Sequence, residues 1–265
     1  MGVIKRNNVK VSGEGIKTLF FVHGYGCNQN MWRFILPAFE NRFKVVLIDL
    51  LGSGDSDVDE YDFEKYSSLE AHADDIIAVC EELSLSQVTL IGHSVSSMIG
   101  AHVAAKRGDL IDKLIMICPS PKYINDGDYV GGFEETQIQE MLETLESNYL
   151  GWSSAITPAI MGNPNRPELT KELETSFCRS VPEIAKHFAR VTFLGDDREI
   201  LGKVSTKTLI LYCQPDFISP EEVSKYVHRS ILGSSISLLK KAQGHCPQMS
   251  APEETIAAIN EFLIN

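Results

Sequence analysis

The sequence of 265 residues predicts an α/β fold in which a mostly parallel, doubly wound sheet is interrupted by an inserted block of helices. Short β-branched runs that are apolar along their whole length are typical of parallel strands covered on both faces. Helical patterns separate these runs, as right-handed strand–helix–strand crossovers require. Residues 131–201 then carry only helical patterns before strand character returns.

The first half of the chain accounts for most of the sheet. A helix is expected over Leu69–Leu85, where apolar residues recur near helical spacing, and another over Met98–Ala105. Strands are expected at Thr18–Val22, Val45–Ile48, Val88–Ile91 and Leu114–Cys118.

The inserted block shows three apolar helical stripes. Ser180 and Glu183 have capping-box spacing and are expected to open the helix of the third stripe. Strands return at Leu209–Tyr212 and Ile236–Leu239, and a last helix begins near Pro252. We therefore expect a core of residues 1–125 and 201–265, with a lid of residues 126–200 over the carboxyl ends of the strands. The stripes are Ile138, Met141, Leu142, Leu145 and Tyr149; Leu169, Leu173 and Phe177; and Ile184, Ala185, Phe188 and Val191.

Composition narrows the function classes. Hydrophobic residues make up 43% and charged residues 23%, and the formal net charge is −12 with a pI near 5.0. An acidic surface disfavours nucleic acid and anionic membrane as partners. No apolar run approaches the ~20 residues of a membrane helix, and the first residues do not resemble a secretory signal. The six cysteines are scattered, which indicates reduced thiols in a cytoplasmic protein. No feature implies a metal, nucleotide or flavin cofactor.

The strongest motif is Gly92-His93-Ser94-Val95-Ser96, between the strand at Val88–Ile91 and the helix at Met98–Ala105. A nucleophile elbow needs this strand–turn–helix context, and small residues two positions either side of the serine let the turn close. Ser96 stands where a second glycine is usual. The motif predicts an α/β-hydrolase fold with Ser94 as the nucleophile.

A serine hydroxyl needs a base, and in this fold the acid and then the histidine follow the serine along the chain. His245, in Gly244-His245-Cys246-Pro247, comes after the last predicted strand and before the last helix. Asp216 follows the strand Leu209–Tyr212, where its carboxylate could hold the imidazole. The alternative interpretation of Asp216 is a plain turn aspartate after proline. Asp196 and Asp197 are weaker candidates because no strand precedes them.

The oxyanion of a tetrahedral intermediate needs backbone donors. One is expected from the N–H of Val95, after the nucleophile, and the other from the N–H of Tyr25, in the loop His23-Gly24-Tyr25-Gly26 after the first strand. The glycine-containing segment at residues 49–56 lacks the lysine of a phosphate-binding loop, so we interpret it as an ordinary turn.

Several longer strings together resemble the RsbQ-type bacterial stress-signalling hydrolases and their plant relatives, the karrikin and strigolactone receptors. They are HGYGCNQNMW, GHSVSSMIG, PSPKYINDGDYVGGFEE, SNYLGW and GHCPQMSAP. The serine at position 96 is what this family shows. PSP, GHCP and Phe177-Cys178 are closer to RsbQ, whereas SVSSMIG is closer to the plant receptors.

The resemblance implies a four-helix, V-shaped lid over a deep apolar pocket and slow hydrolysis of a small hydrophobic ester-like ligand. It also implies signalling through a protein partner, a PAS-domain phosphatase in the RsbQ-like case or an F-box protein in the plant case, where a nuclear location is also expected. Tyr25 departs from the phenylalanine usual at its position and adds a hydroxyl to the pocket. The pocket wall carried over from the family is Tyr25, Phe133, Trp152, Ile156, Phe193 and Phe217.

The sequence leaves three hypotheses about function open. The chain is a signalling hydrolase, a metabolic carboxylesterase or C–C bond hydrolase without a partner, or a binding module that has lost catalysis. The complete Ser–Asp–His set argues against the third.

Overall fold

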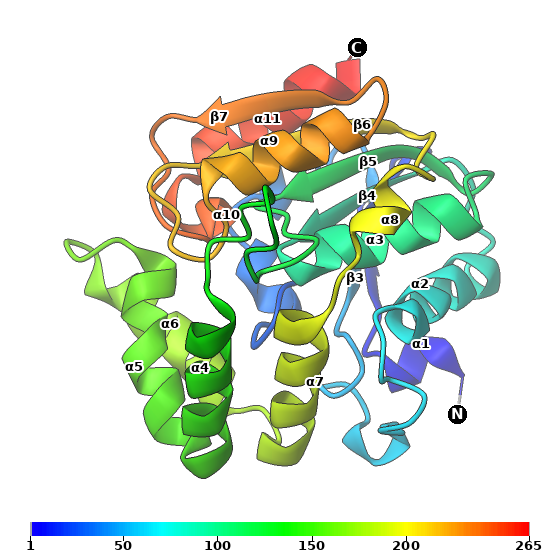
Figure 1. Ribbon diagram of the computed structural model, residues 1–265. Helices are drawn as coiled ribbons and strands as arrows, with labels where there is room; N and C mark the ends of the chain where they lie inside the picture. The colour runs from blue at the N-terminus through cyan, green and yellow to red at the C-terminus, as the bar shows by residue number, and fades with distance from the viewer. Residues whose placement is uncertain (1, 265) are drawn as a thin grey trace.

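One seven-stranded sheet organises the molecule, with strand order β1-β3-β2-β4-β5-β6-β7 (Figure 1). The computed structural model describes residues 2–264. Within them β1 pairs antiparallel with β3, and every other neighbouring pair is parallel. The prediction of a mostly parallel sheet is confirmed. The strands are β1 Lys10–Ser12, β2 Thr18–Val22, β3 Lys44–Ile48, β4 Val88–His93, β5 Ile111–Ile117, β6 Lys207–Cys213 and β7 Ser235–Leu239.

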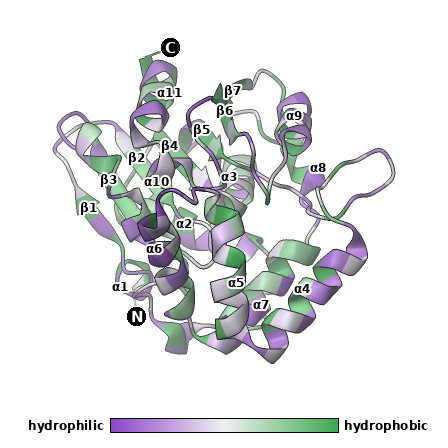
Figure 2. Cartoon of the chain, turned by 90° about the vertical axis from the view of Figure 1, so that its left-hand side faces the viewer, coloured by the Kyte–Doolittle hydropathy of each residue, from purple (hydrophilic) through white to green (hydrophobic). Residues whose placement is uncertain are grey.

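Helices cover both faces of the sheet. The α3 helix packs on β4 and β5, α9 packs on β6 and β7, and α11 lies on the opposite face from α9 (Figures 1 and 2). The α2 helix packs against α3, and the short α10 contacts both α11 and the 3₁₀ helix η1. Outside the inserted block the helices are α1 Val3–Arg6, η1 Gln29–Trp32, η2 Leu36–Ala38, η3 Val58–Glu60, α2 Glu70–Glu82, α3 Val95–Lys106, α8 Arg198–Leu201, α9 Glu221–Ser230, α10 Pro247–Ser250 and α11 Pro252–Ile264.

Four helices occupy the chain between β5 and the short α8, and they form a separate group below the sheet in Figure 1. Each of the four helices buries several apolar side chains. Figure 2 shows hydrophobic and hydrophilic residues on the same helix for α4 and α7. The α4 helix packs against α5 and α7, and α5 packs against α6. The four helices are α4 Glu135–Ser147, α5 Tyr149–Met161, α6 Pro167–Cys178 and α7 Pro182–Leu194.

Two local expectations about this block were wrong. Tyr149 does not continue the first stripe, because α4 ends at Ser147 and the Asn148 side chain caps a new helix by accepting from the Gly151 N–H. Ser180 does not cap α7, which starts at Pro182 after Val181 and has no side-chain cap. A proline at the first helical position has a preset φ and no N–H to satisfy, so it starts the helix without a capping box. The capping box lies instead at Glu134 and Gln137 of α4.

The central strands form the core. Every residue of β2 and β4 is buried, as expected for strands covered on both faces. The edge strand β1 is three residues long and largely exposed, so it has no apolar run by which its sequence could be recognised. In residues 2–264 no helix combines the length and apolarity needed to cross a bilayer.

Candidate active site

Ser94 lies in a strained turn between β4 and α3. Its φ of 57° and ψ of −125° are outside the regions that non-glycine residues usually occupy, as a nucleophile elbow requires. Gly92 permits the turn, because a Cβ there would lie 2.2 Å from the Ser96 carbonyl oxygen. The turn leaves the Ser94 side chain on the cavity at the carboxyl end of the sheet.

The structure brings Ser94, His245 and Asp216 into one hydrogen-bonded series. The distance from Ser94 Oγ to His245 Nε2 is 2.7 Å, and from His245 Nδ1 to Asp216 Oδ2 it is 2.8 Å. Asp216 Oδ1 accepts from the backbone N–H groups of Ile218 and Ser219 at 2.8 and 3.1 Å. All three triad side chains are buried. The carboxylate is therefore held by its own loop while its second oxygen faces the imidazole.

The loop after β2 lies directly against the elbow. A Cβ on Gly24 would come within 3.2 Å of Ser94 Cβ and 2.7 Å of His93 Nδ1, so only glycine lets the loop come this close. The Ser96 hydroxyl donates to the His23 carbonyl oxygen and ties this loop to α3. That bond gives a physical reason for serine at position 96.

The two expected oxyanion donors belong to these two segments. Val95 is the first residue of α3, so its N–H has no partner within the helix. Tyr25 follows Gly24 in the loop against Ser94. The His23 ring connects that loop to the segment after β3. Its Nδ1–H donates to the Gly24 carbonyl at 2.8 Å, and its Nε2 accepts from the Leu50 N–H at 3.0 Å.

Histidine 93 adds a neutral ring beside the triad. Burial lowers the pKa of His93 to about 3, and its Nε2–H donates to the His245 carbonyl oxygen at 2.7 Å. His93 therefore supports the histidine loop without placing a second positive charge next to the His245 imidazole.

Cys118 lies beneath the triad. Its thiol and the side chains of Asp216 and His245 have potential ligand atoms within 4.8 Å of one another, the one such group of three in residues 2–264. Its sulfur is 3.8 Å from that of Cys213, and this contact and burial raise the pKa of the Cys118 thiol well above its usual value. Asp216 and His245 are already hydrogen-bonded to each other, so we assign this cluster to the triad.

The histidine loop is bonded to the end of α5. The His245 N–H donates to the Ile160 carbonyl at 2.8 Å, and Asn163 Nδ2 donates to the Gln243 carbonyl at 2.9 Å. Gly162 ends α5 in the left-handed region, with φ of 63°. A Cβ on Gly162 would lie 2.9 Å from Gly244 Cα. The position of the His245 imidazole and the position of α5 are thus coupled through contacts of the Ile160–Asn163 and Gln243–His245 segments.

Substituting Gly162 with alanine should therefore weaken both stability and catalysis. The left-handed backbone costs a non-glycine residue about 1–2 kcal/mol, and the clash with Gly244 displaces the His245 loop. We expect a lower melting temperature and a lower kcat for an aryl ester. Gly202→Ala is the matched control, because nothing lies within 4 Å of a Cβ there and its φ is −68°. Equal behaviour of the two variants would contradict the coupling.

The cavity above Ser94 is small, about 30 Å³. Tyr25 forms ring contacts with Phe177, Phe188 and Phe193 at centroid distances of 5.6–5.9 Å, and these rings fill the space under the inserted helices. The Tyr25 hydroxyl donates to the Ala185 carbonyl of α7 at 2.9 Å. The hydroxyl that distinguishes Tyr25 from phenylalanine thus ties the loop after β2 to α7. The cavity is small, in contrast to the deep pocket that the resemblance implies.

Two of the six expected wall residues, Tyr25 and Phe193, line this cavity. The structure places the other four, Phe133, Trp152, Ile156 and Phe217, around a separate open hollow of about 460 Å³ beside α4 and α5. The rings of Tyr25 and Trp152, 6.3 Å apart, lie between the two spaces. Several residues that line the cavity were not predicted from the sequence to do so, although Leu173 and Phe177 belong to a predicted helical stripe. The residues not foreseen are Cys27, Tyr123, Ile160, Leu173, Phe177, Thr192, Ile218 and Cys246.

Known proteins share this fold and its sequence pattern. A family model of the alpha/beta hydrolase fold matches residues 17–133. Karrikin insensitive 2 receptor CA of Petunia hybrida is 36% identical over 98% of this chain and 96% of its own length, and strigolactone esterase RMS3 of Pisum sativum is 35% identical over 92% of each chain. A solved hydrolase from Oleispira antarctica has a TM-score of 0.96 and 41% identity over 99% of this chain and 96% of its own. The chain is therefore a hydrolase of the α/β-hydrolase family, in the group that contains the karrikin receptors and strigolactone esterases.

Proposed function

We propose that the chain is a serine hydrolase that cleaves a small hydrophobic ester or lactone, with Ser94 as nucleophile, His245 as base and Asp216 as the acid that holds it. The observation that carries this is the unbroken hydrogen-bonded series from Ser94 Oγ through the His245 ring to Asp216 Oδ2. The cavity beside it is mostly apolar, which favours an apolar acyl group.

The geometry supports acyl transfer in two steps. His245 Nε2 takes the proton of Ser94 as Oγ attacks the ester carbon, and Asp216 stabilises the imidazolium. The N–H groups of Tyr25 and Val95 stabilise the oxyanion. The proton then passes to the leaving oxygen, and a water molecule activated by the same histidine hydrolyses the acyl-enzyme.

We further propose that residues 126–200 act as a lid whose position reports the state of the active site to a protein partner. Relatives at 34–37% identity are named as karrikin receptors or strigolactone esterases. The backbone bonds between the His245 loop and the end of α5 provide a route by which acylation could move α5. The partner would be a PAS-domain phosphatase if the chain acts like RsbQ, or an F-box protein if it acts like the plant receptors. With either partner we expect the protein in the cytoplasm, and with an F-box partner we expect it in the nucleus as well.

A complementation experiment tests the coupling of hydrolysis to signalling. A strain of the source organism that lacks the gene would receive either the unaltered gene or the Ser94→Ala form, and the signalling output and aryl ester hydrolysis would be measured in both. We expect Ser94→Ala to lose both, because the lid is proposed to respond to acylation. Full signalling by Ser94→Ala would contradict the coupling and leave a binding role.

The second candidate is a metabolic carboxylesterase or C–C bond hydrolase with no partner. The observation that favours it is that a rice relative, 34% identical, is named only as a probable esterase. Fast turnover of one metabolite, together with an unchanged signalling output in the deletion strain, would support this candidate.

A further inference from the structure

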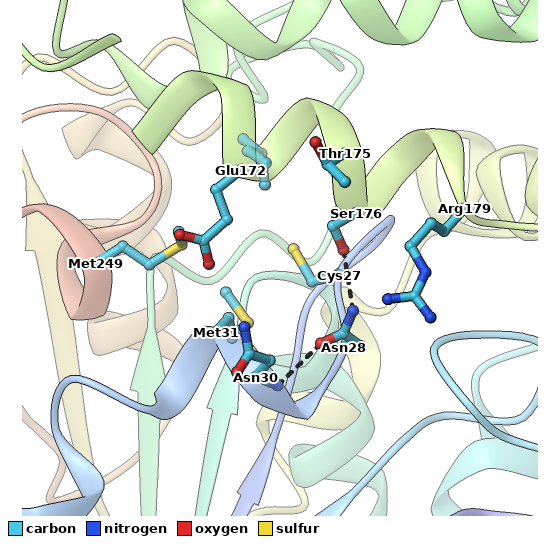
Figure 3. A pocket seen from close by; sticks show the side chains of 10 residues that line it. Cys27, Asn28, Asn30, Met31, Glu172, Thr175, Ser176, Arg179 and Met249 are labelled. Carbon is cyan, nitrogen blue, oxygen red and sulfur yellow. Dashed lines mark hydrogen bonds between the residues drawn. The ribbon is translucent and has the colours of Figure 1, made fainter. Parts of the chain in front are cut away.

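A groove of about 210 Å³, lined by both polar and apolar side chains, lies beside the triad cavity and is not used by the mechanism above (Figure 3). It runs between the loop after β2, η1 and α6, and Met249 of α10 closes one end. Its polar lining residues are Asn28, Asn30, Glu172, Thr175, Ser176 and Arg179.

The groove and the triad cavity share a wall. Cys27 and Leu173 line both spaces, whereas within residues 2–264 no residue lines both the triad cavity and the open hollow at Phe133 and Trp152. Burial raises the pKa of the Cys27 thiol to about 12, so it is a neutral, small side chain in this wall. Cys27 and Leu173 are therefore the side chains that lie between the cavity at Ser94 and the groove.

The groove is on the side of the catalytic histidine. Cys246, next to His245, lines the triad cavity, and Met249, one turn further along the chain, lines the groove. The leaving oxygen of an ester takes its proton from His245 Nε2, so the alcohol half of the substrate must lie on that side of the ester carbon.

The groove suits a neutral, hydroxylated group. Glu172 is paired with the Arg33 guanidinium, and Arg179 is paired with the exposed Asp55 at 3.4 Å, so each of these two charges has a partner of opposite sign. The Asn28 amide donates to the Ser176 hydroxyl at 3.4 Å, and that hydroxyl donates to the Gly26 carbonyl at 2.9 Å. Amide and hydroxyl groups of this kind can both donate to and accept from the hydroxyls of an alcohol.

We propose that the groove is the subsite for the leaving alcohol, and that the natural substrate is an ester of an apolar acid with a small polyhydroxylated alcohol. This rests on the proposed serine hydrolase function. The Ser94 Oγ–carbonyl carbon bond forms, the bond from that carbon to the alcohol oxygen breaks, and His245 Nε2 gives the alkoxide the proton it took from Ser94. The protonated alcohol is then released from the groove, and a water molecule hydrolyses the acyl-enzyme.

Two tryptophan variants on opposite rims test this subsite. Asn30 on η1 and Thr175 on α6 are both exposed lining residues, so Asn30→Trp and Thr175→Trp should fill the groove without opening the core. Lys171→Trp is the control, because Lys171 is an exposed residue of the same helix, one turn away and outside the groove. Acetate release would be followed for glycerol monoacetate and for methyl acetate, which share the acyl group.

Both groove variants should lower kcat/KM for glycerol monoacetate by about tenfold or more, as expected for a lost polar subsite, and leave methyl acetate within about twofold. Lys171→Trp should change neither. Equal loss on both esters, loss in Lys171→Trp, or no loss in either groove variant would overturn the subsite. Labelling of Ser94 by a fluorophosphonate separates the two proposals, because it depends on the triad and needs no alcohol in the groove. Retained labelling with any of these negative results would reject the subsite alone.

Discussion

Replacing Ser94 with alanine should lower kcat for a model aryl ester by about 10⁴-fold or more, the scale seen when a triad nucleophile is removed. In the proposed mechanism the Ser94 Oγ forms the bond to the acyl carbon, and alanine has no such oxygen. In the structure this Oγ is 2.7 Å from His245 Nε2. The remaining rate would come from binding and from the oxyanion donors at Tyr25 and Val95. Steady-state kinetics on the purified protein measure this directly.

The same variant should keep its fold. Ser94 Oγ has its hydrogen bond to His245, but the strained turn is set by Gly92 and by the backbone bond from the Ser94 N–H to the Ile117 carbonyl. We expect a melting temperature within a few degrees of the unaltered protein, since the net loss of one hydrogen bond costs about 1 kcal/mol. An activity loss below about tenfold would mean that another group is the nucleophile.

Replacing Asp216 with asparagine should lower kcat by about 10³- to 10⁴-fold while KM changes little. The amide can still accept from the Ile218 and Ser219 N–H groups, so the loop stays in place. It cannot stabilise the imidazolium, and its NH₂ would favour the wrong imidazole tautomer. Kinetics with the same aryl ester give the kcat and KM effects separately.

Asp197→Asn is the matched control. Asp197 was one of the two weaker sequence candidates, with Asp196, and its carboxylate is paired with His102, 2.7 Å away on α3, rather than with His245. We expect this variant to keep kcat within a few-fold. A large kcat loss in Asp197→Asn together with a small one in Asp216→Asn would reverse the assignment of the acid.

The sheet could be predicted from local sequence patterns, and the proposed triad was assigned from patterns of the same kind, because each depends on a short segment. An apolar run such as Thr18–Val22 is buried on both faces and therefore has one favourable environment, a central parallel strand. The elbow needs its strand, tight turn and helix within a few residues, so Gly92 to Ser96 carries most of its own signal. The chain order of the fold then leaves few choices for the acid and the base.

The inserted helices were harder to predict in detail because their packing depends on residues far apart in sequence. The stripe at Leu169, Leu173 and Phe177 predicts that α6 buries one face, but not that Leu173 lies between the triad cavity and a second groove. The resemblance predicts Phe133 and Phe217 in the wall of the cavity at Ser94. In the structure both residues line the open hollow instead, and the rings of Tyr25 and Trp152 lie between that hollow and Ser94.

Covalent labelling tests the central claim, that Ser94 is a nucleophile activated by His245. The purified protein would be treated with a fluorophosphonate probe, digested, and the modified residue located by mass spectrometry, in parallel with His245→Ala. The account predicts a single labelled site at Ser94 in the unaltered protein and no labelling of His245→Ala on the same timescale, because the serine hydroxyl is a weak nucleophile without its base. Labelling at another residue, or equal labelling of His245→Ala, would contradict it.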